Sequence, residues 1–262
     1  MIGALLDRLG ETCYSQNKMQ EARTYLERAL EMIKRIGTSL FDTARNLFNL
    51  FLLLLETGEK TDAKQHLDRL KEIAELEKNP AITNRTVLAD ALYQMQSPKL
   101  LDKAQAQQKL RDLIHQEDLE INLLIIASLH LFNLYLLEWK VSEDEATLEE
   151  IYRLLDQLQE IVDIQKILPL GVELQLLRAL LALVQGDLSR AEAQITEAIH
   201  AAQTHQLARL VTKAQQLHAQ VHSQVKEWKT LLDENVSIAR RLEKTRMEEY
   251  LKAAMRVIYS QG

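Results

Sequence analysis

A short pattern of small and aliphatic residues recurs along this chain, and its regular spacing limits the possible folds more than any other feature. Each occurrence has a small residue, an aliphatic residue four positions later, and an aliphatic or small residue three positions after that. The occurrences are Ala22-Leu26-Ala29, Ala63-Leu67-Leu70, Ala106-Leu110-Leu113, Thr147-Ile151-Leu154 and Ala191-Ile195-Ala198. Their first members are 41, 43, 41 and 44 positions apart. Steps of four and three residues place side chains on one face of an α-helix, so the sequence predicts one such helix in every repeat.

A second, apolar stretch returns at about twice this spacing. The segment LFNLFLLLLE, residues 47–56, reappears as LFNLYLLEW, residues 131–139, so that Asn49 and Asn133 are 84 positions apart. A helix this apolar has to be covered on several sides, which indicates that it lies inside an array of packed helices. The small residues of the first pattern then belong to the second helix of each repeat. Alanine at those positions allows neighbouring helix axes to approach toward the short end of the usual separation of about 8–10 Å.

The remaining composition is typical of an all-α protein. Leu, Ala, Gln, Glu and Lys, all good helix formers, dominate a chain that has only 7 Gly and 3 Pro residues. Pro80, Pro98 and Pro169 all fall at expected turns, where the first turn of a helix accepts proline. Ser142 and Asp187 are predicted N-caps. The sequence therefore predicts about six antiparallel helix pairs, with helices of roughly 15–22 residues.

The first repeat resembles the tetratricopeptide repeat (TPR). Leu6, Leu9, Gly10 and Cys13 follow the spacing of the W-x2-L-G-x2-Y start of that repeat, and the A-x3-L step at Ala22 comes next. The fifth repeat resembles the family in its second helix. The intervening repeats keep the spacing but lose the glycine and the aromatic residues.

The resemblance covers about residues 1–220, with a repeat longer than the usual TPR length of about 34 residues. It implies a right-handed α-solenoid that holds a peptide or helix of another protein in a concave groove lined by the first helices. Chaperone-binding members of the family hold a C-terminal carboxylate there with Lys and Asn. Asp7 and Glu11 occupy the matching positions of the first repeat and would repel a carboxylate, while only Asn49 fits. A chaperone cofactor of that kind is therefore not expected.

The C-terminal segment departs from the repeats. We expect a repeat array over residues 1–225 and one long C-terminal helix over residues 226–262. The segment becomes basic beyond residue 240, and part of its apolar face consists of Met247, Leu251, Ala254 and Ile258. Three interpretations stay open: a cap that ends the array, a basic helix that docks on an acidic partner or a membrane surface, and the start of a coiled coil with another chain. The cap is favoured, because the last repeat needs a cover.

Charge, cysteine content and hydropathy argue against several other classes of protein. A net charge of -6 and a pI near 5.7 disfavour a chain-wide nucleic-acid interface, which would be basic. The single cysteine, Cys13, cannot form an internal disulfide, which fits a reducing cytoplasm. The sequence shows no secretory leader, and its most apolar stretch, residues 121–137, is short and interrupted by polar residues. We therefore expect a cytoplasmic protein without a membrane span.

The sequence contains no motif for catalysis, cofactor binding or metal binding. Phosphate-binding glycine loops, nucleophile elbows and the H-E-x-x-H zinc motif are absent. His218 and His222 lie one helical turn apart, but a metal site would need a third ligand. We expect a protein that is not an enzyme and has no cofactor and no bound metal. Catalytic residues gathered from distant helices are the least favoured hypothesis.

Polar residues inside apolar helices are the candidate partner-binding residues. They are Asn49, His130 and Asn133, to which we add Leu52 from the same helix as Asn49. Burying such a polar group without a hydrogen bond costs about 1–3 kcal/mol. These side chains therefore bond either an extended ligand in the groove or a neighbouring helix, and the second interpretation is favoured.

Two functions follow from these observations. The first is a protein–protein interaction scaffold that binds a peptide or helix of a partner on the concave face of the array. The alternative is a regulatory, oligomerisation or effector-sensing domain of a larger signalling or transcription-regulator protein, with homo-oligomers formed through the end helices.

Overall fold

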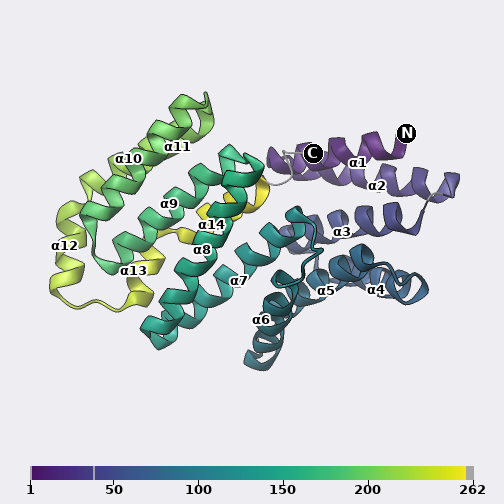
Figure 1. The fold of residues 1–262 in the computed structure, drawn as a ribbon, viewed down its shortest axis with the longest axis horizontal. Coiled ribbons are helices and arrows are strands. Elements are labelled where there is room, and N and C mark those ends of the chain that lie inside the picture. The colour runs from purple at the N-terminus through teal and green to yellow at the C-terminus, as the bar shows by residue number, and fades with distance from the viewer. Residues whose placement is uncertain (1, 38, 258–262) are drawn as a thin grey trace. The chain divides into compact units, whose positions relative to one another are not determined.

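The computed structural model describes residues 2–37 and 39–257, and these residues form fourteen α-helices and no β-strand (Figure 1). They divide into two compact units, whose boundary falls inside one helix between Leu131 and Phe132. The all-α class predicted from the sequence is confirmed. Helices α1 to α12 follow one another as six consecutive pairs. We call the odd-numbered members of these pairs first helices and the even-numbered members second helices.

The first unit is a stack of helix hairpins. Its helices are α1 (Ile2–Ser15), α2 (Met19–Ile36), α3 (Leu40–Thr57), α4 (Lys60–Leu76), α5 (Pro80–Met95), α6 (Leu100–Ile114) and the part of α7 (Ile121–Ser142) up to Leu131. Within it, α1 packs on α2, α3 on α4 and α5 on α6. Contacts of α2 with α3, and of α5 with both α3 and α4, join neighbouring pairs. Stacked hairpins of this kind are the building principle of an α-solenoid.

The second unit is organised around one apolar helix. Besides the rest of α7, it contains α8 (Glu145–Gln165), α9 (Leu168–Gln185), α10 (Leu188–Thr204), α11 (Ala208–Ser223), α12 (Val225–Asp233), α13 (Ile238–Thr245) and α14 (Met247–Val257). Helix α9 packs against α8, α10, α11, α13 and α14. This central position explains why α9 is apolar around most of its circumference.

Most helix ends fall at the turns that the sequence indicates. Gly58 ends α3 at φ 83°, a left-handed conformation that glycine adopts without strain. Asp187 caps α10, since its carboxylate accepts a hydrogen bond of 2.9 Å from the backbone N–H of Arg190, as predicted. The predicted cap at Ser142 is wrong. Ser142 is the last residue of α7, and Asp144 caps α8 instead by accepting the Thr147 N–H at 2.8 Å.

The small residues of the repeat pattern lie on second helices and are buried. Ala22, Ala63, Ala106 and Ala191, on α2, α4, α6 and α10, are all 0% exposed. This burial agrees with the interpretation that small residues mark the positions where helices cross closely. Thr147 occupies the corresponding position of α8 and is also buried.

The C-terminal segment differs from its prediction. Instead of one long helix over residues 226–262, the described residues up to 257 form the three helices α12, α13 and α14. Asn235, at φ 53°, lies in the turn after α12, and Arg246, also at φ 53°, separates α13 from α14. These left-handed residues reverse or bend the chain and direct α13 and α14 back onto α9. Ile258, assigned to the apolar face of the predicted helix, lies outside the described residues.

Two of the described helices, α7 and α9, are long and apolar enough to cross a membrane by length and composition. In the structure, 61% and 67% of their most apolar windows are buried, as in the core helices of a soluble protein. The absence of a membrane span therefore stays a prediction.

Candidate functional site

First helices of the first unit line a groove with a cavity volume of about 270 Å³. Helices α1, α3 and α5 and the beginning of α7 all contribute to it. The lining residues are Asp7, Arg8, Glu11, Phe41, Arg45, Phe48, Asn49, Arg85, Glu120, Asn122, Leu123 and Ile126. The groove thus combines three acidic side chains, three arginines, two phenyl rings and two aliphatic residues.

Asp7 organises one wall of this groove. It is only 1% exposed, and its carboxylate accepts hydrogen bonds from Arg45 Nε at 3.0 Å and from Asn46 Nδ2 at 2.9 Å. Asn46 also donates to the backbone carbonyl of Leu26 at 3.2 Å, so this network connects α1, α2 and α3. A buried carboxylate needs such partners, because its charge is costly to remove from water. The wall is therefore held in place by the fold itself.

Asn49 and Glu11 form the next contact along the same wall. Asn49 Nδ2 donates a hydrogen bond of 2.8 Å to Glu11 Oε1. The pKa of Glu11 is raised, mainly because of burial and secondarily because of the nearby Asp7 charge. The hydrogen bond from Asn49 and the charges of Arg45 and Arg8 lower the pKa but do not cancel these effects. A cation brought by a ligand would stabilise the ionised form of Glu11.

Arg85 and Glu120 form the opposite end of the groove. The Arg85 guanidinium binds the carboxylate in a bidentate pair, with Nη1–Oε1 and Nη2–Oε2 distances of 2.7 and 2.5 Å. Its central carbon also lies 5.1 Å from the centre of the Phe41 ring. Arg85 is buried, and a cation that is both paired and stacked on a ring has little freedom to move. This end of the groove presents a fixed aromatic and charged surface.

The four residues predicted to bind a partner do not line one common pocket. Asn49 lines the groove of the first unit, and its bond to Glu11 is the inter-helix bond favoured from the sequence. Leu52 is buried on the same helix. His130 is half-buried on α7, and burial lowers its pKa to about 4. Asn133 lines a different pocket, in the second unit. Their role in binding stays a prediction.

Sequence reasoning did not identify Phe41, Arg45 and Arg85 as parts of the groove. Arg85 could have been identified from the sequence, because an arginine among the apolar residues of α5 needs a hydrogen-bonding or charged partner when that face is buried. Asp7 and Glu11 were recognised only as positions unsuited to a carboxylate ligand, and the structure places both in the groove wall.

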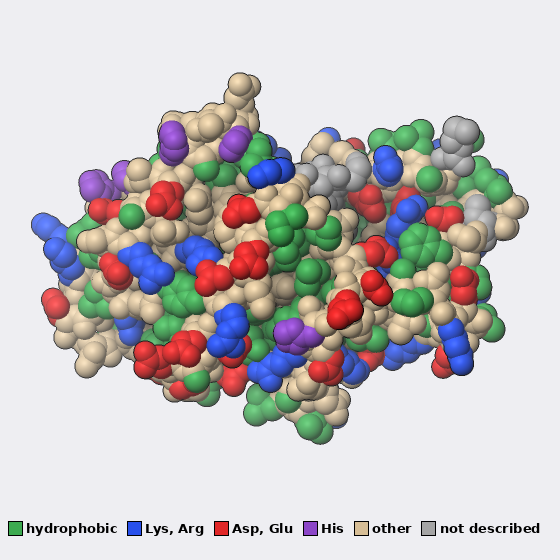
Figure 2. All heavy atoms as spheres, in the orientation of Figure 1, with side chains coloured by type: hydrophobic (Ala, Val, Ile, Leu, Met, Phe, Trp, Pro, Cys, Tyr) green, Lys and Arg blue, Asp and Glu red, His purple; other side chains and the backbone are tan. Residues whose placement is uncertain are grey.

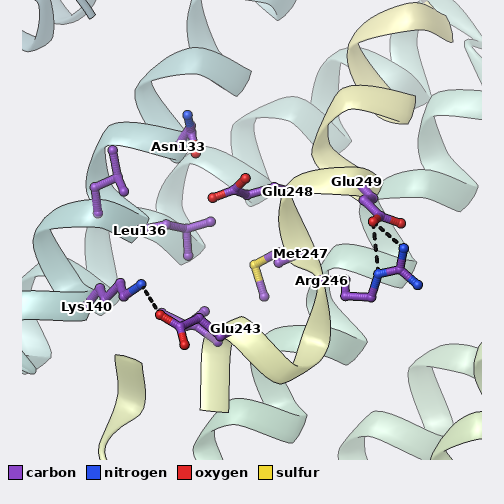
Figure 3. Close-up of a pocket in the computed structure, with 10 residues that line it drawn as sticks. Asn133, Leu136, Lys140, Glu243, Arg246, Met247, Glu248 and Glu249 are labelled. Atoms are coloured by element: carbon purple, nitrogen blue, oxygen red, sulfur yellow. Dashed lines mark hydrogen bonds and ion pairs between the residues drawn. The ribbon is translucent and has the colours of Figure 1, made fainter. Parts of the chain in front are cut away.

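The pocket of the second unit has a volume of about 300 Å³ and lies beneath the C-terminal helices. Asn133, Leu136, Leu137 and Lys140 of α7 face residues of α13 and α14 across it (Figure 3). Lys140 Nζ binds Glu243 Oε1 at 2.7 Å, and Arg246 pairs with Glu249 on the opposite side. The floor contains Leu242 and Met247, so the pocket is apolar inside and charged at its rim.

The described residues offer no cluster of three or more His, Cys, Asp or Glu side chains that could hold a metal ion. Several histidines gather on the surface over α10 and α11 (Figure 2). Among them, the His218 and His222 rings stack 5.5 Å apart, and Nδ1 of His222 lies 3.5 Å from Glu192 Oε1. Burial raises the pKa of Cys13, which is the opposite of what a reactive thiolate requires.

The paired helices and the buried small residues together define a helical-repeat protein. The family model of the tetratricopeptide repeat matches residues 1–75, which span α1 to α4. This match and the helical pairs support the TPR-like fold, and TPR repeats generally mediate protein–protein interaction. No curated protein and no solved structure matches the chain.

Proposed function

We propose that this protein is a non-enzymatic interaction scaffold whose first-unit groove binds a peptide or helix of a partner protein. The observation that carries the proposal is the position of the groove on α1, α3 and α5, all of them first helices. Its charged walls are held by internal hydrogen bonds, so binding would require little rearrangement. A preformed site avoids part of the ordering cost of binding.

The groove chemistry favours one type of segment. Phe41 is half-buried in the groove and offers its ring to a large apolar side chain of the ligand. Phe48 and Ile126 also line the groove but are only 2% and 3% exposed. Among the described residues Glu11 forms no ion pair, although the charges of Arg45 and Arg8 lower its pKa, and a lysine or arginine of the ligand would bring a closer cation. We therefore expect a segment that combines an apolar anchor with a basic residue, and we expect the partner to be a protein rather than a nucleic acid.

A peptide-display selection against the full chain tests this proposal. Phe41→Ala removes a half-buried ring from the groove, and Tyr25→Ala removes a half-buried ring from α2, outside the groove, as the matched control. Selected peptides should bind the Phe41→Ala variant at least about tenfold more weakly, as expected for loss of an aromatic anchor. The control should bind as the unmodified chain does. Equal effects of both substitutions would contradict the proposal.

Self-association through an end helix is a second candidate function. Helix α1 leaves Ile2, Leu5 and Leu9 exposed at 60, 60 and 38%, and their spacing places them on one side of the helix. Light scattering distinguishes this candidate, because Leu5→Lys should convert any dimer into a monomer. A chain that is monomeric before the substitution excludes it.

A further inference from the structure

The C-terminal helices of the second unit cover the first-helix face of that unit. Helices α13 and α14 both pack on α9. The Lys213 ammonium of α11 lies 4.4 Å from the centre of the Tyr250 ring on α14, and Lys140 of α7 binds Glu243 of α13. The segment thus contacts the first helices α7, α9 and α11, and Lys244 of α13 also pairs with Glu227 of α12. In the first unit, the corresponding helices carry the open groove.

We propose that residues 238–257 act as an intramolecular ligand of this face, and that an amphipathic helix of a partner protein binds there in their place. This proposal concerns a different surface from the groove of the first unit and does not depend on it. Four observations support it: the form of the segment, its incomplete fit, the polar pair beneath it and the linker that precedes it.

Helix α14 is attached in the way that a separate amphipathic helix binds to a groove. Met247, Leu251 and Ala254 follow the i, i+4, i+7 spacing of anchor residues, and all three are buried. Charged residues of the same helix, such as Glu248, Glu249 and Lys252, are exposed. The segment contributes one apolar stripe to the unit and leaves its other side to solvent.

The fit between this segment and the face beneath it is incomplete. A pocket of about 300 Å³ remains between α7 and the α13–α14 junction, lined by Leu136, Leu137 and Met247 among others (Figure 3). This pocket is a recess partly open to solvent, and it marks a place where α13 and α14 do not close over α7. Arg241 Nη1 donates to the carbonyl of Val184 at 2.6 Å, but its Nε is buried without a hydrogen-bond partner. A helix with larger apolar side chains at the junction would fill this space better.

The face under α14 also contains a charged pair. Glu173 of α9 accepts hydrogen bonds from Lys213 of α11 at 2.6 and 2.8 Å, and the ring of Tyr250 covers the lysine. Packing apolar residues in place of such a pair is often as stable or more stable in a permanently closed core. Charged side chains such as Glu173 and Lys213 are favourable on a face that water or another polar ligand reaches when α14 leaves.

A short exposed linker allows the segment to leave as a unit. Residues 234–237 connect α12 to α13, and most of their side chains are exposed. Helix α12 packs on α11, so it stays with the scaffold when the linker moves. The partner helix should then carry a bulky apolar residue in the place of Met247, an acidic residue opposite Lys140 and an aromatic residue opposite Lys213.

A nicked chain tests the proposal without a destabilising substitution. A protease site is inserted into residues 234–237 of the full chain, and the folded protein is cleaved there. A fluorescein-labelled synthetic peptide of residues 238–257 is then added, and fluorescence anisotropy reports binding. The control peptide carries Leu251→Asp, which places a charge at an anchor position. A third peptide carries Met247→Phe, which extends toward the unfilled pocket.

We expect the labelled peptide to replace the cleaved segment while the rest of the chain keeps its helical circular-dichroism signal. The Leu251→Asp peptide should bind at least about tenfold more weakly, and the Met247→Phe peptide about threefold more tightly, because it buries more apolar surface. Equal binding of the native and Leu251→Asp peptides would overturn the proposal. So would a nicked chain that keeps its own segment until the whole protein unfolds, because the segment would then be a fixed part of the core.

Discussion

Gly10 on α1 and Leu26 on α2 approach so closely that no side chain fits between them. A Cβ atom at position 10 would lie 2.6 Å from Leu26 Cγ and 2.8 Å from Leu26 Cδ2. Leu26 is the central member of the first repeat pattern, and Gly10 is the glycine of the TPR-like stretch. The contact therefore joins the two sequence features that predicted the fold.

Substituting Gly10 distinguishes the effect of helix propensity on stability from the effect of packing. Alanine is favoured over glycine inside a helix by about 1 kcal/mol. At position 10, however, overpacking against Leu26 should cost about 1–3 kcal/mol, so Gly10→Ala should lower the free energy of unfolding in urea. Gly3→Ala on the same helix is the control, because its Cβ would meet nothing closer than 3.4 Å. The control should be neutral or stabilising. Equal effects at both positions would mean that α1 and α2 do not approach as described.

The hydrogen bond between Asn49 and Glu11 predicts a stability loss for Asn49→Ala. Without the amide, the half-buried Glu11 carboxylate loses a donor, which should cost about 1–3 kcal/mol. A double-mutant cycle with Glu11→Ala, measured by urea unfolding, should give a coupling free energy between the two positions of at least about 0.5 kcal/mol. No coupling would instead favour a role for Asn49 in contacting a ligand.

Because of His130, we expect the protein to lose stability in mild acid. Its pKa is about 4 in the folded state against 6.5 as the ordinary value, because burial disfavours the charged ring. The unfolded chain therefore binds the additional proton first as the pH falls from 6.5 toward 4. Over this interval the free energy of unfolding should decrease by up to about 3 kcal/mol through this group. In the His130→Asn variant, the free energy of unfolding, measured in urea at several pH values, should depend less steeply on pH. Identical slopes of the free energy of unfolding against pH in the variant and the unmodified chain would contradict the low pKa of His130.

In the Lys213→Met variant, the stability of the protein should change with pH in the opposite direction. The Glu173 carboxylate is 2% exposed, and burial raises its pKa although Lys213 lowers it in part. Without the lysine, the folded state holds the Glu173 proton to higher pH than the unfolded chain does. The variant should therefore be most stable in acid and lose stability as the pH rises through the folded-state pKa. The loss near neutral pH should reach about 3–5 kcal/mol. The double variant Glu173→Gln, Lys213→Met should remove this pH dependence, and persistence of the dependence would contradict its origin in Glu173.

Sequence spacing predicted the helix pairs because helices that pack in register repeat their small residues at fixed intervals. Ala63 and Ala191 are examples: each is identified by its spacing, and each is fully buried. The breaks in the C-terminal segment could not be predicted in the same way. Arg246 adopts a left-handed conformation without being a glycine, and its strain is compensated by the contacts of α13 and α14 with α9, which are distant in sequence.

The groove was less predictable than the helices that form it. Its lining comes from helices far apart in the sequence, and the pairing of Arg85 with Glu120 or of Arg45 with Asp7 depends on how those helices stack. Asn49 was identified because a polar residue inside an apolar helix needs a partner. The sequence left open whether that partner was a ligand or Glu11, and the hydrogen bond between them agrees with the inter-helix interpretation.

Hydrogen–deuterium exchange with a display-selected peptide tests whether a ligand binds in the groove of the first unit. The full chain is compared with and without a saturating amount of the peptide, and protection is mapped onto individual helices. We expect slower exchange in α1, α3 and α5, which line the groove, and unchanged exchange on the outer side of α2, α4 and α6. Protection confined to those second helices, or to the second unit alone, would contradict binding in the first-unit groove.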